Sequence, residues 1–173
     1  INVYCFFGKN PVNLSRREYR VRASKDSLKA ALAFSLVKIA DFKKNQILLD
    51  PFCQDGIILI EAALLGGKKI YGLSQDIKNA SINSKVAKGK INFYKEDLTW
   101  LSTLFKKNSI DLIITKPLYP SKTKSINFVN RIIRELFNQA NSLLKNKGKI
   151  IFLTPKPELI EKYAKLYHFN IKE

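Results

Sequence analysis

The sequence contains no methionine, a single histidine and only two cysteines, Cys5 and Cys53. Two cysteines are too few for a disulfide framework, and their separation does not match a metal site. No apolar run approaches the roughly 20 residues needed to cross a membrane, and no secretory leader is visible at the start. These absences argue against a secreted disulfide-rich protein, a metalloprotein and a membrane protein, and we expect a cytoplasmic location.

Acidic residues are also scarce. The chain has 14 Asp and Glu against 31 Lys and Arg, which gives a formal net charge of +17 and a pI near 9.9. Such an excess favours a polyanion as partner, because Lys and Arg side chains that contact phosphates release bound counterions. A generally Lys-rich proteome is the competing explanation. We favour a nucleic acid, because the acidic residues are not raised together with the lysines.

The rest of the composition is that of one folded domain. A chain of 173 residues with 46% hydrophobic residues can bury a sizeable core. Because a chain without methionine does not begin at a translation start, we expect it to be processed or to be a fragment of a longer protein. We divide it into an N-terminal extension, residues 1–24, and one domain, residues 25–173.

Apolar runs of strand length alternate with helix-like segments along this domain. The predicted strands are residues 47–49, 69–73, 91–94, 110–115, 150–154 and 169–171, with a further strand-like run at 3–7. The predicted helices are residues 57–65, 77–87, 98–106, 127–145 and 158–166. Strict alternation of this kind predicts an α/β fold, a mostly parallel sheet with helices on both faces.

Three local patterns add detail. A first helix is expected to begin at Ser24 or Asp26, where either side chain can cap it. Its apolar stripe is Leu28, Leu32, Leu36 and Ile39. Gly148 is typical of a helix C-cap, so we expect the helix 127–145 to end there. Trp100 is expected to pack in the core or against a pocket wall.

The stretch around which the chain is organised is residues 48–63. An apolar strand leads into the turn residues Asp50, Pro51 and Gly56, and a mostly apolar helix follows. In doubly wound sheets the ligand lies beyond the carboxyl ends of the strands, against the N-terminus of the first helix. On shape alone, this is equally the first βα unit of any α/β protein.

The residue types are more specific than the shape. Asp50-Pro51-Phe52-Cys53, Gly56 and the helix Ile58-Leu59-Ile60-Glu61-Ala62-Ala63 resemble motif I of the S-adenosylmethionine-dependent RNA methyltransferases that often carry a THUMP domain, written DPFCGSGTILIEAA. The resemblance implies a Rossmann-like methyltransferase fold whose cofactor lies along this turn. The implied contacts are Asp50, Phe52, Gln54, Asp55 and Gly56. We expect Cys53 to be a small packed residue, not a nucleophile.

The centre of the motif departs from the family. Gln54 stands where the first glycine is expected, Asp55 where serine is, and Ile57 where threonine is. Asp55 would compete with the methionine carboxylate for the amides at the helix N-terminus. It could instead pair with the methionine ammonium.

A second resemblance lies upstream of the motif. Arg17-Glu18-Tyr19-Arg20 and Ser27-Leu28-Lys29 are similar to the family's entry segment, RGYR followed by APLK, with Glu18 in place of glycine. In the family this segment connects an upstream RNA-binding module to the catalytic domain and helps to cover the pocket. The resemblance therefore implies an RNA-binding domain ahead of this chain. The arginines fit a solvated surface and RNA-backbone contact equally well.

Acidic residues follow the next two predicted strands. An acid at the end of the second strand accepts hydrogen bonds from ribose hydroxyls in nucleoside-binding sheets. By the resemblance, that acid would stand at position 74, where this chain has Ser74 instead. Asp76 in the following turn is therefore the available candidate. Asp97 holds the position of the acid that accepts from the adenine amine, and it could instead be the N-cap of the next helix.

Residues 116–120, Lys-Pro-Leu-Tyr-Pro, take the place of motif IV, which the family writes as Asn or Asp followed by Pro-Pro-Tyr. In the family the Asn or Asp accepts from the target amine, and the tyrosine stacks on the flipped base. The resemblance therefore assigns the catalytic positions to Lys116, Pro117 and Tyr119. Lys116 replaces the acceptor by an ammonium, which has three donors and no acceptor, and which would repel the developing cation.

Two functions remain open. The first is an S-adenosylmethionine-dependent methyltransferase that modifies guanine N2 in tRNA or rRNA, with weakened chemistry. The second is a degenerate, non-catalytic methyltransferase fold that binds RNA or a protein partner. In either case we expect six strands, because no sequence remains for the seventh, antiparallel strand that methyltransferase sheets usually add.

Overall fold

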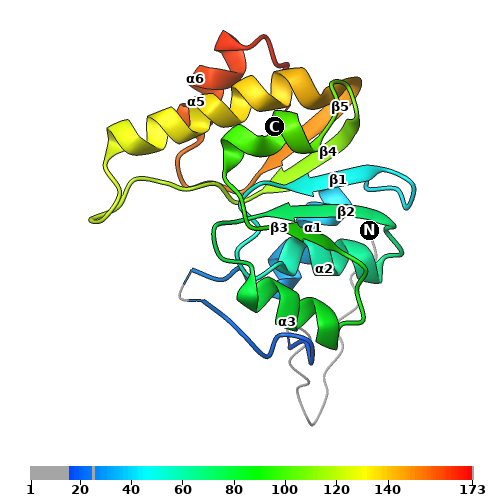
Figure 1. The fold of residues 1–173 in the computed structure, drawn as a ribbon. Helices are drawn as coiled ribbons and strands as arrows, with labels where there is room; N and C mark the ends of the chain where they lie inside the picture. The colour runs from blue at the N-terminus through cyan, green and yellow to red at the C-terminus, as the bar shows by residue number, and fades with distance from the viewer. Residues whose placement is uncertain (1–15, 25, 173) are drawn as a thin grey trace, which may run out of the picture.

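The computed structural model describes residues 16–24 and 26–172, and the strand-like run predicted at 3–7 lies outside them. Five strands form one sheet in the order β3-β2-β1-β4-β5, and every neighbouring pair is parallel. The strands are β1 (Ile47–Asp50), β2 (Lys69–Leu73), β3 (Asn92–Tyr94), β4 (Ile110–Thr115) and β5 (Leu144–Phe152). The first crossover, through β1 and β2, lies at the centre of the sheet (Figure 1).

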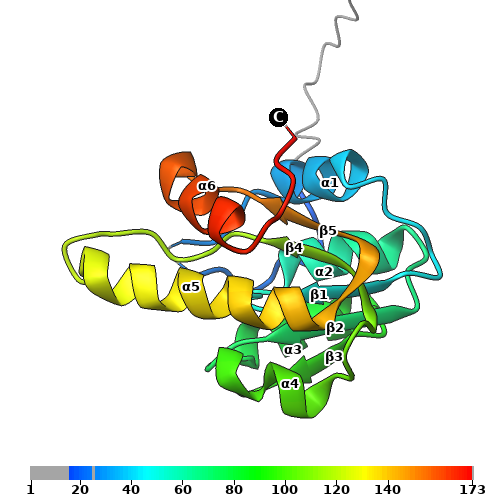
Figure 2. The ribbon, with the colours of Figure 1, turned by 90° about the horizontal axis from the view of Figure 1, so that it is seen from above.

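Helices cover both faces of the sheet, which confirms the predicted α/β architecture (Figures 1 and 2). The helices are α1 (Ala30–Ile39), α2 (Ile57–Leu64), α3 (Lys78–Val86), the 3₁₀ turn η1 (Leu98–Trp100), α4 (Leu101–Leu104), α5 (Ile126–Leu143) and α6 (Pro157–Leu166). Leu48 joins the core beneath α1 and α2, whereas Leu49 joins the core beneath α4 and α5. Successive side chains of a strand point to opposite faces, so fully apolar strands supply both cores.

The predicted apolar stripe of the first helix is wrong for two of its four residues, and the helix begins later than Ser24 or Asp26. Helix α1 begins at Ala30, and two stripe members, Leu32 and Ile39, are 47% and 71% exposed. Its buried residues are Ala30, Ala33, Leu36 and Val37. Helix α1 packs on α2, and the small side chains on that face let the two helices approach closely. Packing between helices, not the largest side chains, therefore decides which face is buried.

The predicted glycine cap of the long helix is also wrong. Helix α5 ends at Leu143, and Leu144 is already extended and starts β5. The register between β4 and β5 shifts between Ile110 and Leu112, so the residues up to Gly148 form an irregularity in the strand. A Cβ on Gly148 would lie 2.9 Å from both Leu144 Cδ2 and Lys145 O. The glycine thus permits a tight strand path and does not end a helix.

Two smaller expectations also fail. Trp100 is 50% exposed, because it lies in the short turn η1 at the surface. Residues 169–171 are not a strand; instead Phe169 packs edge-on against Phe137, with ring centroids 5.5 Å apart. The described residues therefore contain five strands, one fewer than predicted. Among those same residues, no helix is both long and apolar enough to cross a membrane.

We predict that Gly72→Ala destabilises the fold through overpacking. Gly72 lies in β2 against α2, and a Cβ there would lie 2.5 Å from Leu59 Cδ1 and 2.9 Å from Phe93 Cδ1. We expect a loss of about 1–3 kcal/mol in the free energy of unfolding, measured by denaturant titration. Gly89→Ala is the matched control, because its Cβ would meet Ser84 Oγ at an ordinary 3.4 Å. Equal losses in the two variants would contradict the prediction.

Candidate functional site

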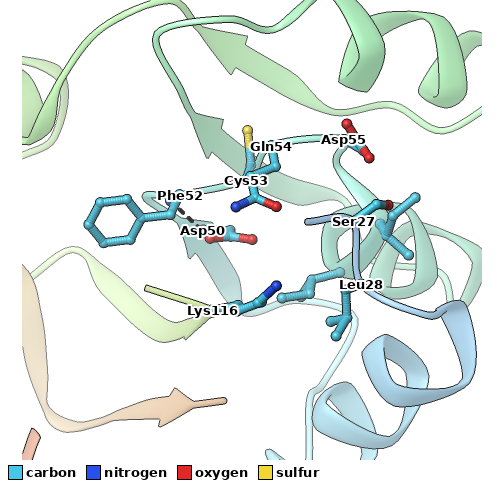
Figure 3. A pocket seen from close by; sticks show the side chains of 10 residues that line it. Ser27, Leu28, Asp50, Phe52, Cys53, Gln54, Asp55 and Lys116 are labelled. Carbon is cyan, nitrogen blue, oxygen red and sulfur yellow. Dashed lines mark hydrogen bonds between the residues drawn. The ribbon is translucent and has the colours of Figure 1, made fainter. Parts of the chain in front are cut away.

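A pocket lies where the carboxyl ends of β1 and β4 meet. The two strands are neighbours in the sheet, so the turn after β1 and the first residue after β4 come together. The pocket has a cavity volume of about 20 Å³. Its lining residues are Ser27, Leu28, Asp50, Phe52, Cys53, Gln54, Asp55, Ile57, Ile58 and Lys116. Figure 3 shows the Gln54 amide, the Asp50 carboxylate and the Lys116 ammonium turned toward its centre.

Asp50 is the buried polar centre of this pocket. Its Oδ1 accepts hydrogen bonds from Phe52 N at 3.0 Å and from Thr115 Oγ1 at 2.7 Å. The first bond orders the turn after β1, and the second joins that turn to the end of β4. Burial raises the pKa of Asp50 to about 7, although both hydrogen bonds act in the opposite direction. Burial therefore favours the protonated carboxyl over the carboxylate.

The turn after β1 keeps a backbone that suits glycine. Gly56 has φ 76°, and a Cβ there would lie 3.1 Å from Ala80 Cβ. Gln54 also has a left-handed backbone, with φ 47°, at the position where the resembled motif has glycine. A non-glycine residue in this region costs roughly 1–2 kcal/mol. The turn has kept its shape although Gln54 is strained.

Cys53 lies at the base of the turn and is 4% exposed. Its amide donates to Leu73 O at 3.0 Å, which ties the turn to the end of β2. Burial raises the pKa of its thiol well above the ordinary value. The side chain is therefore a packed thiol, as the sequence predicts, and not an activated nucleophile.

Asp55 faces the N-terminal segment. Its Oδ2 accepts from Ser24 N at 2.7 Å, and its Oδ1 accepts from Asn79 Nδ2 at 3.3 Å. In Figure 3 its carboxylate points away from Lys116 and from the pocket centre. Asp55 thus lines the pocket while its two oxygens hold other parts of the chain. The predicted contact between Asp55 and a cofactor stays a prediction.

Two further polar residues dock the same N-terminal segment. Glu61, which is 3% exposed, accepts from Arg17 Nε at 2.9 Å and from Tyr19 Oη at 2.6 Å. The burial of Tyr19 and its bond to Glu61 raise the pKa of the phenol. Asn83 accepts from Arg22 N at 2.9 Å and donates to Arg22 O at 2.8 Å. Residues 17–24 are therefore fixed across α2 and α3 by buried polar side chains.

The role of Glu61 was not predicted from the sequence, although this residue lies within motif I. A glutamate in an otherwise apolar helix was the available signal, because a buried carboxylate requires a partner. Arg17 is that partner. This arginine therefore contributes to the fold, and its side chain is only partly exposed to a ligand such as RNA.

Lys116 crosses the pocket. Its Nζ donates to the backbone carbonyl of Asp26 at 2.7 Å, joining the end of β4 to the segment that precedes α1. Pro117 is buried and Tyr119 is half-buried, and neither lines the pocket. The structure therefore unites Lys116 with the turn after β1, and it places Tyr119 further along the same loop.

Asp76 and Asp97 lie outside the pocket lining, on the turns after β2 and β3. Asp76 Oδ1 accepts from Lys78 N at 2.9 Å. Asp97 is the N-cap of η1, since its Oδ1 accepts from Thr99 N at 2.9 Å. These Thr99 hydrogen bonds lower the pKa of Asp97. Each carboxylate is exposed and lies at the same sheet edge as the pocket, so the predicted ribose and adenine contacts remain predictions.

This geometry, with a glycine turn after the first central strand and acids after the next two, is that of a Rossmann-like nucleoside-binding methyltransferase. The family comparison agrees, because the model described as "UPF0020: RMKL-like, methyltransferase domain" matches residues 17–173. The chain belongs to this methyltransferase family. The geranyl diphosphate methyltransferase whose structure was solved in complex with S-adenosylmethionine has a similar fold, with a TM-score of 0.56 and 15% identity over 84% of this chain and 60% of that chain.

Individual proteins show the same relationship. The tRNA (guanine(6)-N2)-methyltransferase of Methanocaldococcus jannaschii is 27% identical over 94% of this chain, which spans 53% of that protein. A probable tRNA (guanine(10)-N2)-dimethyltransferase of Methanothermococcus thermolithotrophicus is 29% identical over 81% of this chain and 92% of its own length. The crystal structure of TrmN from Thermus thermophilus matches with a TM-score of 0.69 and 26% identity, over 80% of this chain and 42% of that chain.

The residues present fit this cofactor at the turn. The α2 N-terminus begins at Gly56 with no side-chain cap, so its first amides are available for a carboxylate such as that of methionine. Asp76 and Asp97 keep one carboxylate oxygen each beyond their local bonds. The turn residues 50–56 and these two acids therefore remain the predicted contacts of the cofactor. The residue at the motif IV position suits methyl transfer less well, because the Lys116 ammonium has no lone pair to accept a hydrogen bond from the target amine.

We predict that Asp50→Asn flattens the dependence of stability on pH. The folded pKa of Asp50, about 7, lies above the ordinary value of 3.8, so between these pH values the folded state binds the proton that the unfolded state has lost. Wild-type stability therefore falls relative to the variant as pH rises from about 4 to 7, by on the order of 4 kcal/mol. Asparagine can still accept both hydrogen bonds.

Denaturant titrations across this pH range measure the effect. Asp76→Asn serves as the control, because Asp76 is exposed, and we expect it to leave the wild-type pH profile in place. Parallel pH profiles for wild type and Asp50→Asn would contradict the prediction.

Proposed function

We propose that this chain is the catalytic domain of an RNA methyltransferase that acts on the exocyclic N2 of guanine in tRNA or rRNA, in the cytoplasm. The relatives named above carry tRNA guanine-N2 methyltransferase names. The net charge of +17 supports a polyanionic substrate, because phosphate contacts dominate nucleic-acid affinity. The chain spans about half the length of the first of these relatives.

One observation carries the proposal. The turn that corresponds to motif I and the residue that opens motif IV line the same pocket, and the Asp50–Thr115 hydrogen bond joins the two strand ends. A methyl donor held on the turn after β1 and an amine held after β4 would therefore lie next to each other. Holding two reactants in such proximity is a large part of catalysis for a bimolecular transfer.

Each part of the site has a defined task in this reaction. S-adenosylmethionine, when bound, supplies the electrophilic methyl group. Residues 50–56 hold its methionine end, and Asp76 and Asp97 accept from its ribose and adenine. Tyr119, which is half-buried in the loop after β4, stacks on the extruded guanine. Lys116 donates where an acceptor is needed, so the transition state loses electrostatic stabilisation and transfer is slow.

A second function, a non-catalytic methyltransferase fold that binds RNA, is favoured by one observation. The Lys116 ammonium faces the pocket and is held there by the Asp26 carbonyl. An ammonium at this place disfavours both a sulfonium and an amine that gains positive charge. Micromolar binding of S-adenosylmethionine in calorimetry would support the enzyme, whereas no binding at millimolar cofactor would establish the non-catalytic function.

We predict that Lys116→Asn raises the rate of methyl transfer. Asparagine restores an acceptor oxygen, and one well-placed polar group is typically worth about a hundredfold in rate. The measurement is transfer of labelled methyl groups from S-adenosylmethionine to unmodified tRNA, with detection of N2-methylguanosine in the digested product.

Lys107→Asn is the matched control, because Lys107 is exposed ahead of β4 and lies outside the pocket lining. We expect it to leave the rate unchanged. If neither wild type nor Lys116→Asn transfers methyl groups although both bind the cofactor, the proposal of guanine N2 as target is wrong.

A further inference from the structure

A second hollow lies beside the loop that carries motif IV. It is a groove between the first part of α5 and the start of α6, with a cavity volume of about 410 Å³. Its lining residues are Pro120, Ile126, Asn130, Lys156, Glu158, Leu159 and Lys162. Helix α6 lies alongside α5 on the face of the sheet opposite α1 (Figures 1 and 2). None of these residues belongs to the pocket at β1 and β4.

The floor of the groove is apolar and open to solvent. Ile126 is 51% exposed on the first turn of α5, and Leu159 and Pro120 are partly exposed on the opposite side and at the end. Exposed apolar side chains are ordinary when scattered, but here three of them share one hollow. Apolar side chains of this kind can contact the face of a base or the carbon atoms of a ribose.

The walls of the groove carry donors. The Lys156 and Lys162 side chains are exposed, and Lys162 Nζ lies 5.5 Å from the centroid of the Tyr163 ring. Asn130 accepts from Tyr163 Oη at 3.2 Å, which leaves its amide nitrogen available as a donor. Glu158 is the one acidic residue of the lining, and its carboxylate can accept from a 2′-hydroxyl or a base amine. The charge balance therefore favours an anion that also presents donors.

The chain segment next to the groove is also positively charged. Residues 116–134 contain Lys116, Lys122, Lys124, Arg131 and Arg134, and no acidic residue. This stretch runs from the pocket, through the loop, onto α5. The groove lies next to the loop that carries motif IV, because Pro120 lines the groove and directly follows Tyr119.

We propose that this groove binds the single-stranded RNA next to the target nucleotide, with phosphates at Lys156 and Lys162 and one base or ribose on Ile126, Pro120 and Leu159. The proposal rests on RNA being the substrate. An unpaired strand fits better than a duplex, because the apolar floor can contact only an unstacked base or an exposed ribose. The groove thus selects target nucleotides that lie in a loop or at an end.

The test is fluorescence anisotropy of the full chain with a labelled single-stranded RNA that contains one guanine, at several salt concentrations. For Lys156→Ala/Lys162→Ala we expect about tenfold weaker binding at physiological salt, and a salt slope reduced by about 1.4, or about 0.7 for each lost phosphate contact. The matched control is Lys106→Ala/Lys107→Ala, which removes the same charge from exposed lysines ahead of β4, at the opposite edge of the sheet.

A second variant separates base contact from charge. Ile126→Ser removes apolar surface without changing charge, so we expect affinity to fall several-fold while the salt slope stays unchanged. Ile39→Ser is its control, because Ile39 is 71% exposed on α1. A circular-dichroism spectrum of each variant verifies that it is folded.

Four outcomes would overturn the proposal that the groove binds RNA. If the groove and control lysine pairs weaken binding equally, the lysines act only through net charge. If RNA binds wild type and the groove variants alike, the groove proposal fails while the RNA substrate stands. If wild type binds no RNA even at low salt, both fail together. Binding of duplex RNA as tightly as single strands would also contradict it.

Discussion

The hydrogen bond from Thr115 Oγ1 to the buried Asp50 carboxylate holds the site together. Asp50 ends β1, and Thr115 ends β4, so one interaction of 2.7 Å fixes the distance between the turn that would hold a cofactor and the loop that would hold a target. Both residues are almost completely buried, so the bond forms in a low-dielectric setting where losing it would leave an unpaired polar group.

Two departures from the resembled motifs have related structural effects. Asp55 accepts from Ser24, and Lys116 donates to Asp26. Both contacts therefore reach the stretch that precedes α1, one from each side of the pocket. Glu61 and Asn83 dock the residues just upstream. The substitutions thus remove features suited to transfer and add bonds that hold the N-terminal segment over the site.

Five of the six predicted strands are present, because apolar runs of strand length bounded by turn residues are consistent with buried strands. The turn of residues 50–56 was found for the same reason, since glycine and proline mark it. Features decided by long-range packing were not predictable. The buried face of α1 depends on α2, and the bulged start of β5 depends on Ile110 of β4. Glu61 finds Tyr19 and Arg17 more than 40 residues away. Neither Lys116 over the pocket nor the groove between α5 and α6 leaves a periodic signal in the chain.

The strand order also defines the sheet edges through which copies of the molecule could associate. Strands β3 and β5 are the two ends of the sheet within the described residues, and an unpaired edge can recruit a strand from another molecule. Strand β3 limits this by being three residues long. Strand β5 is nine residues long but carries exposed Lys145, Lys147 and Lys149 at alternate positions. Two such edges repel each other, so part of the positive charge that suits a polyanion also protects the protein against edge-to-edge aggregation.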